Sequence, residues 1–203
     1  MAELYVAEVD YEEAKKLADL ASIYQDLSFT IDTLKRLLRL LKENDEDRVL
    51  IQSLWTAALI SYARCFSSGK RFGLSESIFE KLEGDPIGCH RYYRNLRDKH
   101  IAHSVNPFEQ VVVGLVLSEP DNPKREVLGV ATLSQKLVCT DIEGVEALLT
   151  LASVVREEVA RQAKEYQAKT LEVGKGLPID TLYSKATIRT ITPGPEDAGI
   201  ARE

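Results

Sequence analysis

Apolar side chains recur at helical spacing over the first third of the chain. Between Asp10 and about Lys42 they stand three or four residues apart, at Leu17, Leu20, Tyr24, Leu27, Ile31, Leu34, Leu38 and Leu41. This pattern predicts a long amphipathic helix, and Asp10 followed by Glu13 is typical of a capping arrangement at its start. A second helix is predicted from about Glu46 to Phe66. Because this segment is apolar over much of its circumference, we expect it to lie centrally.

The next helix is marked at both ends by proline. A short helical turn is predicted from Ser75 to Leu82. Gly84-Asp85-Pro86 then places a capping residue before a proline at the first helical position, and Asn106-Pro107 marks the stop. We therefore predict a helix from about Pro86 to Ser104.

Two valine-rich runs follow this helix, Glu109 to Leu117 and Glu126 to Leu133, and they predict a β-hairpin with a longer loop. The stretch from Thr140 to Glu143 has the pattern of a capping box, and helical spacing continues to about Leu171. The pattern thus predicts a mainly α domain over residues 1–171, with a β-hairpin at about 109–134. Residues 172–203 are expected to form an extended or partly ordered tail, because they offer little apolar material to bury.

Composition narrows the class of protein. The 203 residues carry a net charge of -6, which argues against a protein that coats nucleic acid, since such proteins present a broad basic face. The first ten residues lack the basic flank and apolar segment of a secretion signal, so we expect a cytoplasmic protein with no membrane span. Three widely spaced cysteines indicate reduced thiols, not a disulfide framework.

A cationic segment nevertheless interrupts this acidic chain. All three histidines lie between residues 89 and 104, together with Arg91, Arg94, Arg97 and Lys99. Histidine exchanges protons near neutral pH, and arginine is a permanent, planar receptor for anions. The segment therefore indicates a site for a phosphate-containing substrate.

The order of residues in this segment resembles a known motif. Helical bundles of the HEPN superfamily carry an arginine, a polar residue and, after four to six intervening positions, a histidine. The run from Arg97 and Asp98 to His103 matches, with five residues between the arginine and the histidine and four of them after Asp98, and Arg94-Asn95 to His100 matches in an overlapping register. The string Arg-Asp-Lys-x-x-Ala-His looks most like the abortive-infection, AbiU-type branch.

The resemblance implies an up-and-down HEPN-like bundle that cleaves RNA without a metal or another cofactor, in a defence or toxin–antitoxin system. A histidine would take the 2′-hydroxyl proton while an arginine stabilises the phosphoryl oxygens. By this resemblance the catalytic candidates are Arg97, Asp98, His100 and His103, and the RNA-binding candidates are Arg94, Asn95 and Lys99. The implied partners are a second copy bound through the motif helix, an RNA substrate and a neutralising protein.

Helix geometry constrains such a site. Residues six apart on an ideal α-helix differ by about 120° in direction and about 9 Å in height. Arg97 and His103 would therefore not share one intrahelical site. Local unwinding before Pro107, or a composite site across two subunits, would bring such groups together.

Other interpretations stay open. Arg97, Asp98 and His100 could form a structural polar network, in a catalytically silent HEPN-like protein that only forms a homodimer. His100 and His103 have a spacing suited to zinc, but no third ligand stands at a recognisable distance, so no metal is predicted. His90 is expected to be a surface or core residue outside the site, and Trp55, Tyr62, Phe66 and Phe72 are expected in the core.

Overall fold

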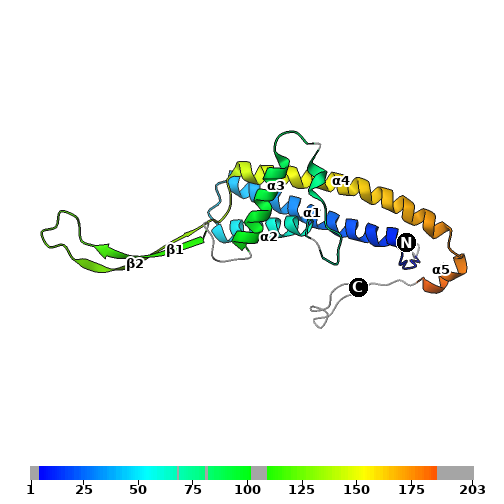
Figure 1. Ribbon diagram of the computed structural model, residues 1–203, viewed down its shortest axis with the longest axis horizontal. Helices are drawn as coiled ribbons and strands as arrows, with labels where there is room; N and C mark the ends of the chain where they lie inside the picture. Colours follow the sequence, from blue (N-terminus) through cyan, green and yellow to red (C-terminus); the bar gives the residue numbers. More distant parts are fainter. Residues whose placement is uncertain (1–4, 68, 81, 102–108, 187–203) are drawn as a thin grey trace.

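The computed structural model describes residues 5–67, 69–80, 82–101 and 109–186. Two long helices, α1 (Glu12–Lys42) and α4 (Ile142–Lys175), lie side by side along most of the molecule (Figure 1). Helix α2 (Arg48–Arg64) packs against α1, and the shorter α3 (Pro86–Asn95) contacts α2 and α4. The mainly helical architecture is as the apolar periodicity predicts.

Three shorter elements complete the helical part. A 3-10 turn, η1 (Glu76–Phe79), precedes α3, and a π-helical segment, η2 (Leu96–Ile101), continues it. Helix α5 (Ile179–Lys185) follows α4. The first part of the predicted tail is thus helical, and α4 itself runs four residues beyond the predicted end at Leu171. Residues 187–203 lie outside the described part of the chain.

The core is formed where all the main helices meet. In α1 the buried side chains run from Leu20 to Leu40, and in α4 they run from Val145 to Val159. Trp55 and Tyr62 of α2 are almost fully buried, and most other positions of this helix are buried or partly buried, in agreement with its largely apolar circumference. Burial of a large apolar side chain stabilises the fold by about 1.5–3 kcal/mol, so this region carries most of the stability.

Two helix starts differ from the prediction. The residue before α1 is Tyr11, which makes no capping hydrogen bond, while Asp10 forms an ion pair with Lys15 at 2.7 Å. At α4 the cap is Asp141, whose carboxylate accepts a hydrogen bond from the Gly144 N–H at 2.8 Å. Asp141, and not the predicted Thr140, therefore caps the start of α4. At α3 the predicted cap, Asp85, accepts from the Gly88 N–H.

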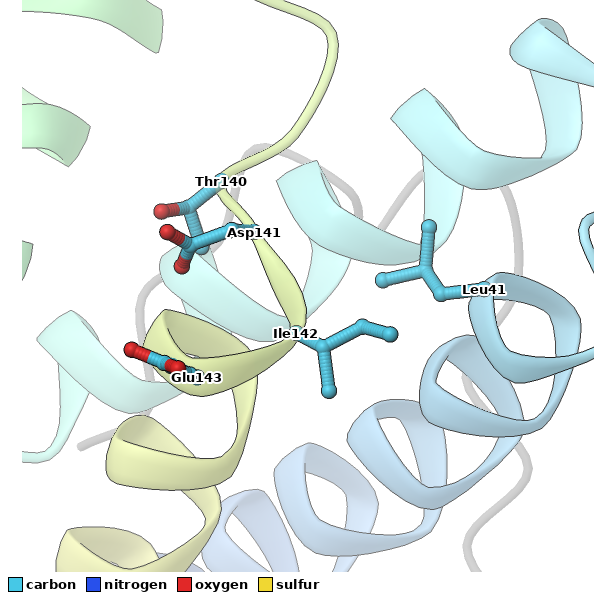
Figure 2. Close-up of a pocket in the computed structure, with 5 residues that line it drawn as sticks. All are labelled: Leu41, Thr140, Asp141, Ile142 and Glu143. Atoms are coloured by element: carbon cyan, nitrogen blue, oxygen red, sulfur yellow. The ribbon is translucent and has the colours of Figure 1, made fainter.

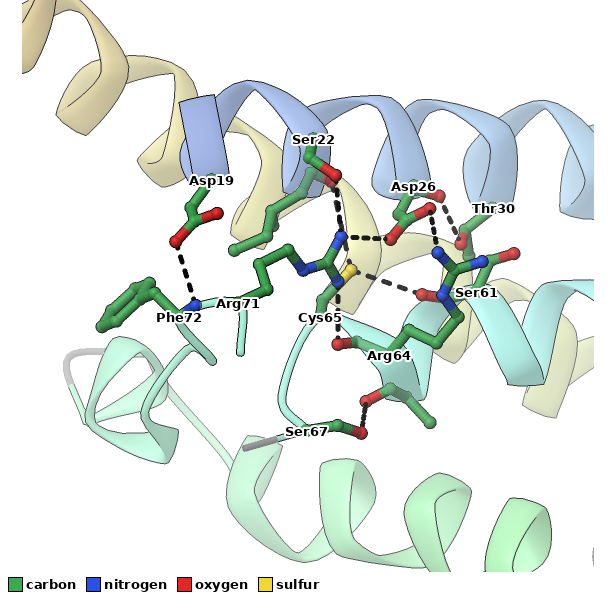
Figure 3. Close-up of polar contacts among 12 residues, drawn as sticks. Asp19, Ser22, Asp26, Thr30, Ser61, Arg64, Cys65, Ser67, Arg71 and Phe72 are labelled. Carbon is green, nitrogen blue, oxygen red and sulfur yellow. Dashed lines mark hydrogen bonds and ion pairs between the residues drawn. The ribbon is translucent and has the colours of Figure 1, made fainter. Parts of the chain in front are cut away.

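An arginine anchors the loop after α2 to α1 (Figure 3). Nη1 of Arg71 donates to Asp26 Oδ2 at 2.8 Å and to Ser22 Oγ at 2.9 Å, and Nη2 donates to the carbonyl of Arg64. One side chain therefore joins α1, the end of α2 and the loop. The next residue, Phe72, is 38% exposed beside Lys16, so the prediction that Phe72 belongs to the core is wrong.

The predicted hairpin is present as strands β1 (Glu109–Leu117) and β2 (Val127–Lys136), which pair antiparallel. The register aligns Val113 with Thr132 and Leu115 with Val130. The hairpin projects away from the helices (Figure 1), and among the described elements only its own two strands make an extensive contact with it. It is therefore an arm outside the helical core.

Candidate functional site

The predicted site lies on the second half of the helix formed by α3 and η2. His90, Tyr93 and Leu96 stand three residues apart and are all at least 98% buried, so they form the inward face of this helix. The Tyr93 hydroxyl donates to the Gly144 carbonyl of α4 at 2.6 Å, and its ring packs edge-on against Trp55. These contacts fix the rotation of the helix and thus the direction of its cationic side chains.

The motif residues fall on the remaining faces. Asn95 and Lys99 are exposed, and Arg94, Arg97 and Asp98 are partly exposed. Nη1 of Arg97 pairs with Asp98 Oδ1 at 2.9 Å. That contact uses one of the five N–H donors of a guanidinium, and the Arg97 side chain keeps 37% of its surface exposed. His100 lies on η2, but its side chain is outside the described part of the structure, as is the whole of His103.

The backbone of the motif is π-helical from Leu96 to Ile101. A π-helix bonds each N–H to the carbonyl five residues earlier, so one extra residue enters the turn and later side chains change direction. The rotation calculated for an ideal α-helix therefore does not apply to Leu96–Ile101, and His103 lies outside the described residues. Such π-turns occur frequently at functional sites. The spacing of apolar residues predicted a helix here but not its π-helical form, because spacing alone does not reveal the hydrogen-bond register.

His90 has a different environment from the motif. Its Nδ1 lies 2.9 Å from the Tyr62 hydroxyl, and its ring packs against the rings of Phe66 and Phe79, which also stack on each other. Burial lowers the pKa of His90 to about 4, although the nearby Glu76 carboxylate opposes this shift. A fully buried, neutral histidine is a core residue, which agrees with the expectation that it lies outside the site.

Glu76 also neutralises the first arginine of the cationic segment. Its Oε2 accepts hydrogen bonds from Arg91 Nη2 at 2.8 Å and Nε at 3.0 Å. This contact holds the pKa of Glu76 below its usual range. Two arginines of the segment are thus paired, Arg91 with Glu76 and Arg97 with Asp98, whereas Arg94 and Lys99 form no ion pair with a described residue.

A shallow hollow lies where the end of α1 meets the start of α4 (Figure 2). It is lined by Leu41, Thr140, Asp141, Ile142 and Glu143. Its floor is apolar and both of its charged residues are acidic, so it is poorly suited to a phosphate. Within the described residues, no cluster of three or more potential ligands could hold a metal ion, and no helix is long and apolar enough to cross a membrane.

Comparison of the chain with known protein families, with curated proteins and with solved structures finds no significant match.

Proposed function

We propose that this chain is a HEPN-like, metal-independent endoribonuclease of a defence or toxin-type system. The observation that carries the proposal is the combination of a π-turn with a partly exposed Arg97, on a helix whose opposite face is firmly anchored in the core. The anchoring keeps the arginine in a fixed direction. Preorganised charge of this kind stabilises a phosphoryl transition state without rearrangement during the reaction.

Each residue type has a role in the proposed reaction. His103, or His100 in the overlapping register, takes the proton of the 2′-hydroxyl, which then attacks the adjacent phosphorus and displaces the 5′-oxygen. The Arg97 guanidinium stabilises charge on the non-bridging oxygens, and Asp98 orients that guanidinium through their ion pair. Arg94, Asn95 and Lys99 contact the RNA backbone. The products carry a 2′,3′-cyclic phosphate and a free 5′-hydroxyl.

A second candidate is a non-catalytic HEPN-like protein that forms a homodimer through the motif helix. The Arg97–Asp98 ion pair at 2.9 Å favours it, because a paired arginine also serves as a structural element. In that case no residue of the segment touches a substrate, and a partner protein, not RNA, is the ligand.

Cleavage of mixed RNA in the presence of EDTA, with detection of cyclic phosphate ends, separates the two candidates. Arg97→Ala and His103→Ala should each reduce cleavage about 10²- to 10⁴-fold, the typical effect of losing an acid–base or charge-stabilising group. Arg91→Ala is the matched control, because Arg91 lies on the same helix but is paired with Glu76. Unchanged cleavage in the Arg97 and His103 variants would refute the nuclease proposal.

Mixing the two inactive variants tests whether the site is shared. If Arg97 and His103 of different subunits form one site, mixed dimers contain one intact site and regain part of the activity. If each subunit is self-sufficient, mixing restores nothing. A protein that cleaves no RNA and loses thermal stability in both variants would instead favour the non-catalytic homodimer.

A further inference from the structure

The β-hairpin leaves an unusual amount of apolar surface in solvent. Its large apolar side chains are 40–68% exposed, and they are Val111, Val112, Val113, Leu115, Val116, Leu117, Val127, Leu128, Val130 and Leu133. Near-continuous apolar strands are typical of sheets that are covered on their faces. An isolated two-stranded hairpin is also only marginally stable in water. No described part of the chain outside the hairpin therefore forms a covering layer over the arm.

The register divides these side chains between two faces. Directly opposed residues of an antiparallel pair point to the same side of the sheet. One side, here called the Val113 face, consists of Val111, Val113, Leu115, Val130, Thr132 and Ser134, with the opposed pair Glu109 and Lys136 at its base. The other side, here called the Gly114 face, consists of Val112, Gly114, Val116, Gly129, Ala131 and Leu133.

The Val113 face is the better docking surface. Its four valine and leucine side chains are each 64–68% exposed, and they adjoin one another across the two strands. The Gly114 face has two glycines and an alanine at its centre, and a Cβ atom at Gly114 would meet nothing within 4 Å. The Gly114 face therefore offers less apolar area than the Val113 face, and its centre has almost no side chains with which a partner could pack.

Charge around the hairpin disfavours insertion into a membrane. The connection between the strands contains Glu119, Asp121, Lys124, Arg125 and Glu126. A hairpin that entered a bilayer would carry this charged tip into the hydrocarbon first, at a cost of several kcal/mol. The strands themselves have no charged residue between Gln110 and Leu117 or between Val127 and Gln135.

Packing of the Val113 face against its own copy requires that no charged side chain lie near the two-fold axis. In a two-fold interface the same patch meets itself, so any charge near the axis would face a like charge. Apart from the oppositely charged Glu109 and Lys136 at its base, the Val113 face contains only apolar and hydroxyl side chains and is compatible with its own copy. Neither strand interior contains a proline or lysine, the residues that natural edge strands use to prevent pairing.

We propose that the hairpin is a self-association arm in which the Val113 faces of two copies of this chain pack against each other. Contact between two such faces would remove on the order of 1,000 Å² of surface in total, at the lower end of specific interfaces. Association through the arm alone is therefore weak and depends on concentration. This contact is separate from the motif helix, and it does not depend on the nuclease proposal.

The test measures the oligomeric state of the full chain by sedimentation equilibrium over a wide range of concentration. Val113→Lys and Val113→Glu should each remove one association step, because the two-fold axis places like charges together. Val112→Lys is the matched control, since Val112 is the adjacent exposed valine on the Gly114 face. Mixing the Val113→Lys and Val113→Glu variants should restore association, because opposite charges then meet.

Three results would overturn the proposal. One is a wild-type chain that stays monomeric at every concentration. Another is equal disruption by Val112→Lys and Val113→Lys, which would show that the Val113 face is not the contact. The third is a mixture of the two Val113 variants that associates no better than either alone. Circular dichroism of each variant checks that the helical core is retained, and co-sedimentation with anionic lipid vesicles would reveal a membrane surface as the occupant instead.

Discussion

His90 should make the stability of this fold depend on pH in a defined range. An unfolded histidine titrates near 6.5, whereas burial lowers the pKa of folded His90 to about 4. Between these values the unfolded chain binds a proton that the folded chain does not. The contribution of neutral His90 to the free energy of unfolding is therefore fully present above about pH 6.5. It is lost progressively as the pH falls toward 4.

The size of this effect follows from the pKa difference. A shift of one unit corresponds to about 1.4 kcal/mol, so the full loss below pH 4 is about 3 kcal/mol. At about pH 5 the free energy of unfolding is lower by about 2 kcal/mol than at neutral pH. This is a large fraction of the 5–15 kcal/mol that holds a typical domain together. Nε2 of the buried ring makes no hydrogen bond to a described residue, and the Glu76 carboxylate 3.8 Å away only partly offsets the cost of protonating the ring.

Urea unfolding followed by far-ultraviolet circular dichroism measures this loss at about pH 7.5 and about pH 5. The comparison is with the double variant Tyr62→Phe/His90→Phe, which replaces both partners of the 2.9 Å contact with apolar rings of similar shape. Surface carboxylates titrate in both proteins, so the difference between them isolates His90. Equal losses in the two proteins, or a His90 ring resonance that titrates near 6.5, would refute the reasoning.

Two further substitutions test the packing of the core and of the loop after α2. Trp55→Ala should lower the free energy of unfolding by about 3–5 kcal/mol, because the ring is 1% exposed. Trp55→Phe should destabilise the fold much less, since the buried indole N–H has no described hydrogen-bond partner to lose. A thermal midpoint unchanged by Trp55→Ala would contradict the burial of the ring. Gly73→Ala should destabilise by about 1–3 kcal/mol, because its Cβ would stand 2.7 Å from the Ser67 carbonyl oxygen. Gly69→Ala, whose Cβ meets nothing within 4 Å, is the control and should be nearly neutral in the same thermal melt.

The elements that could be predicted are those with strong periodicity. The long apolar stripe of α1 predicted its end at Lys42, and a valine-rich run predicted β1 over Glu109–Leu117. The caps were less predictable, because Thr140 and Asp141 are both good capping residues and only the backbone conformation selects Asp141. Phe72 was misplaced because an apolar ring beside a loop can also be covered by a lysine.

The candidate site could be predicted only in part. Charge and spacing placed the motif on the second half of a helix, but they did not decide whether His90 lies on the surface or in the core. His90 is flanked by Cys89 and Arg91, and nothing in that pattern indicates that Tyr62, twenty-eight residues earlier, binds its ring. The π-turn at Leu96–Ile101 is a change in hydrogen-bond register, which a pattern of residue types does not reveal.

The place of the hairpin in the chain has a mechanical consequence. Seven residues separate Ile101 of the motif segment from β1, and four residues separate β2 from the Asp141 cap of α4. A ten-residue strand is about 33 Å long, so a 10° rotation about the base moves its far end by about 6 Å. The four-residue connection after β2 joins the base of this arm directly to the cap of α4. A force applied at the distant end of the hairpin is therefore transmitted to α4 through a short connection.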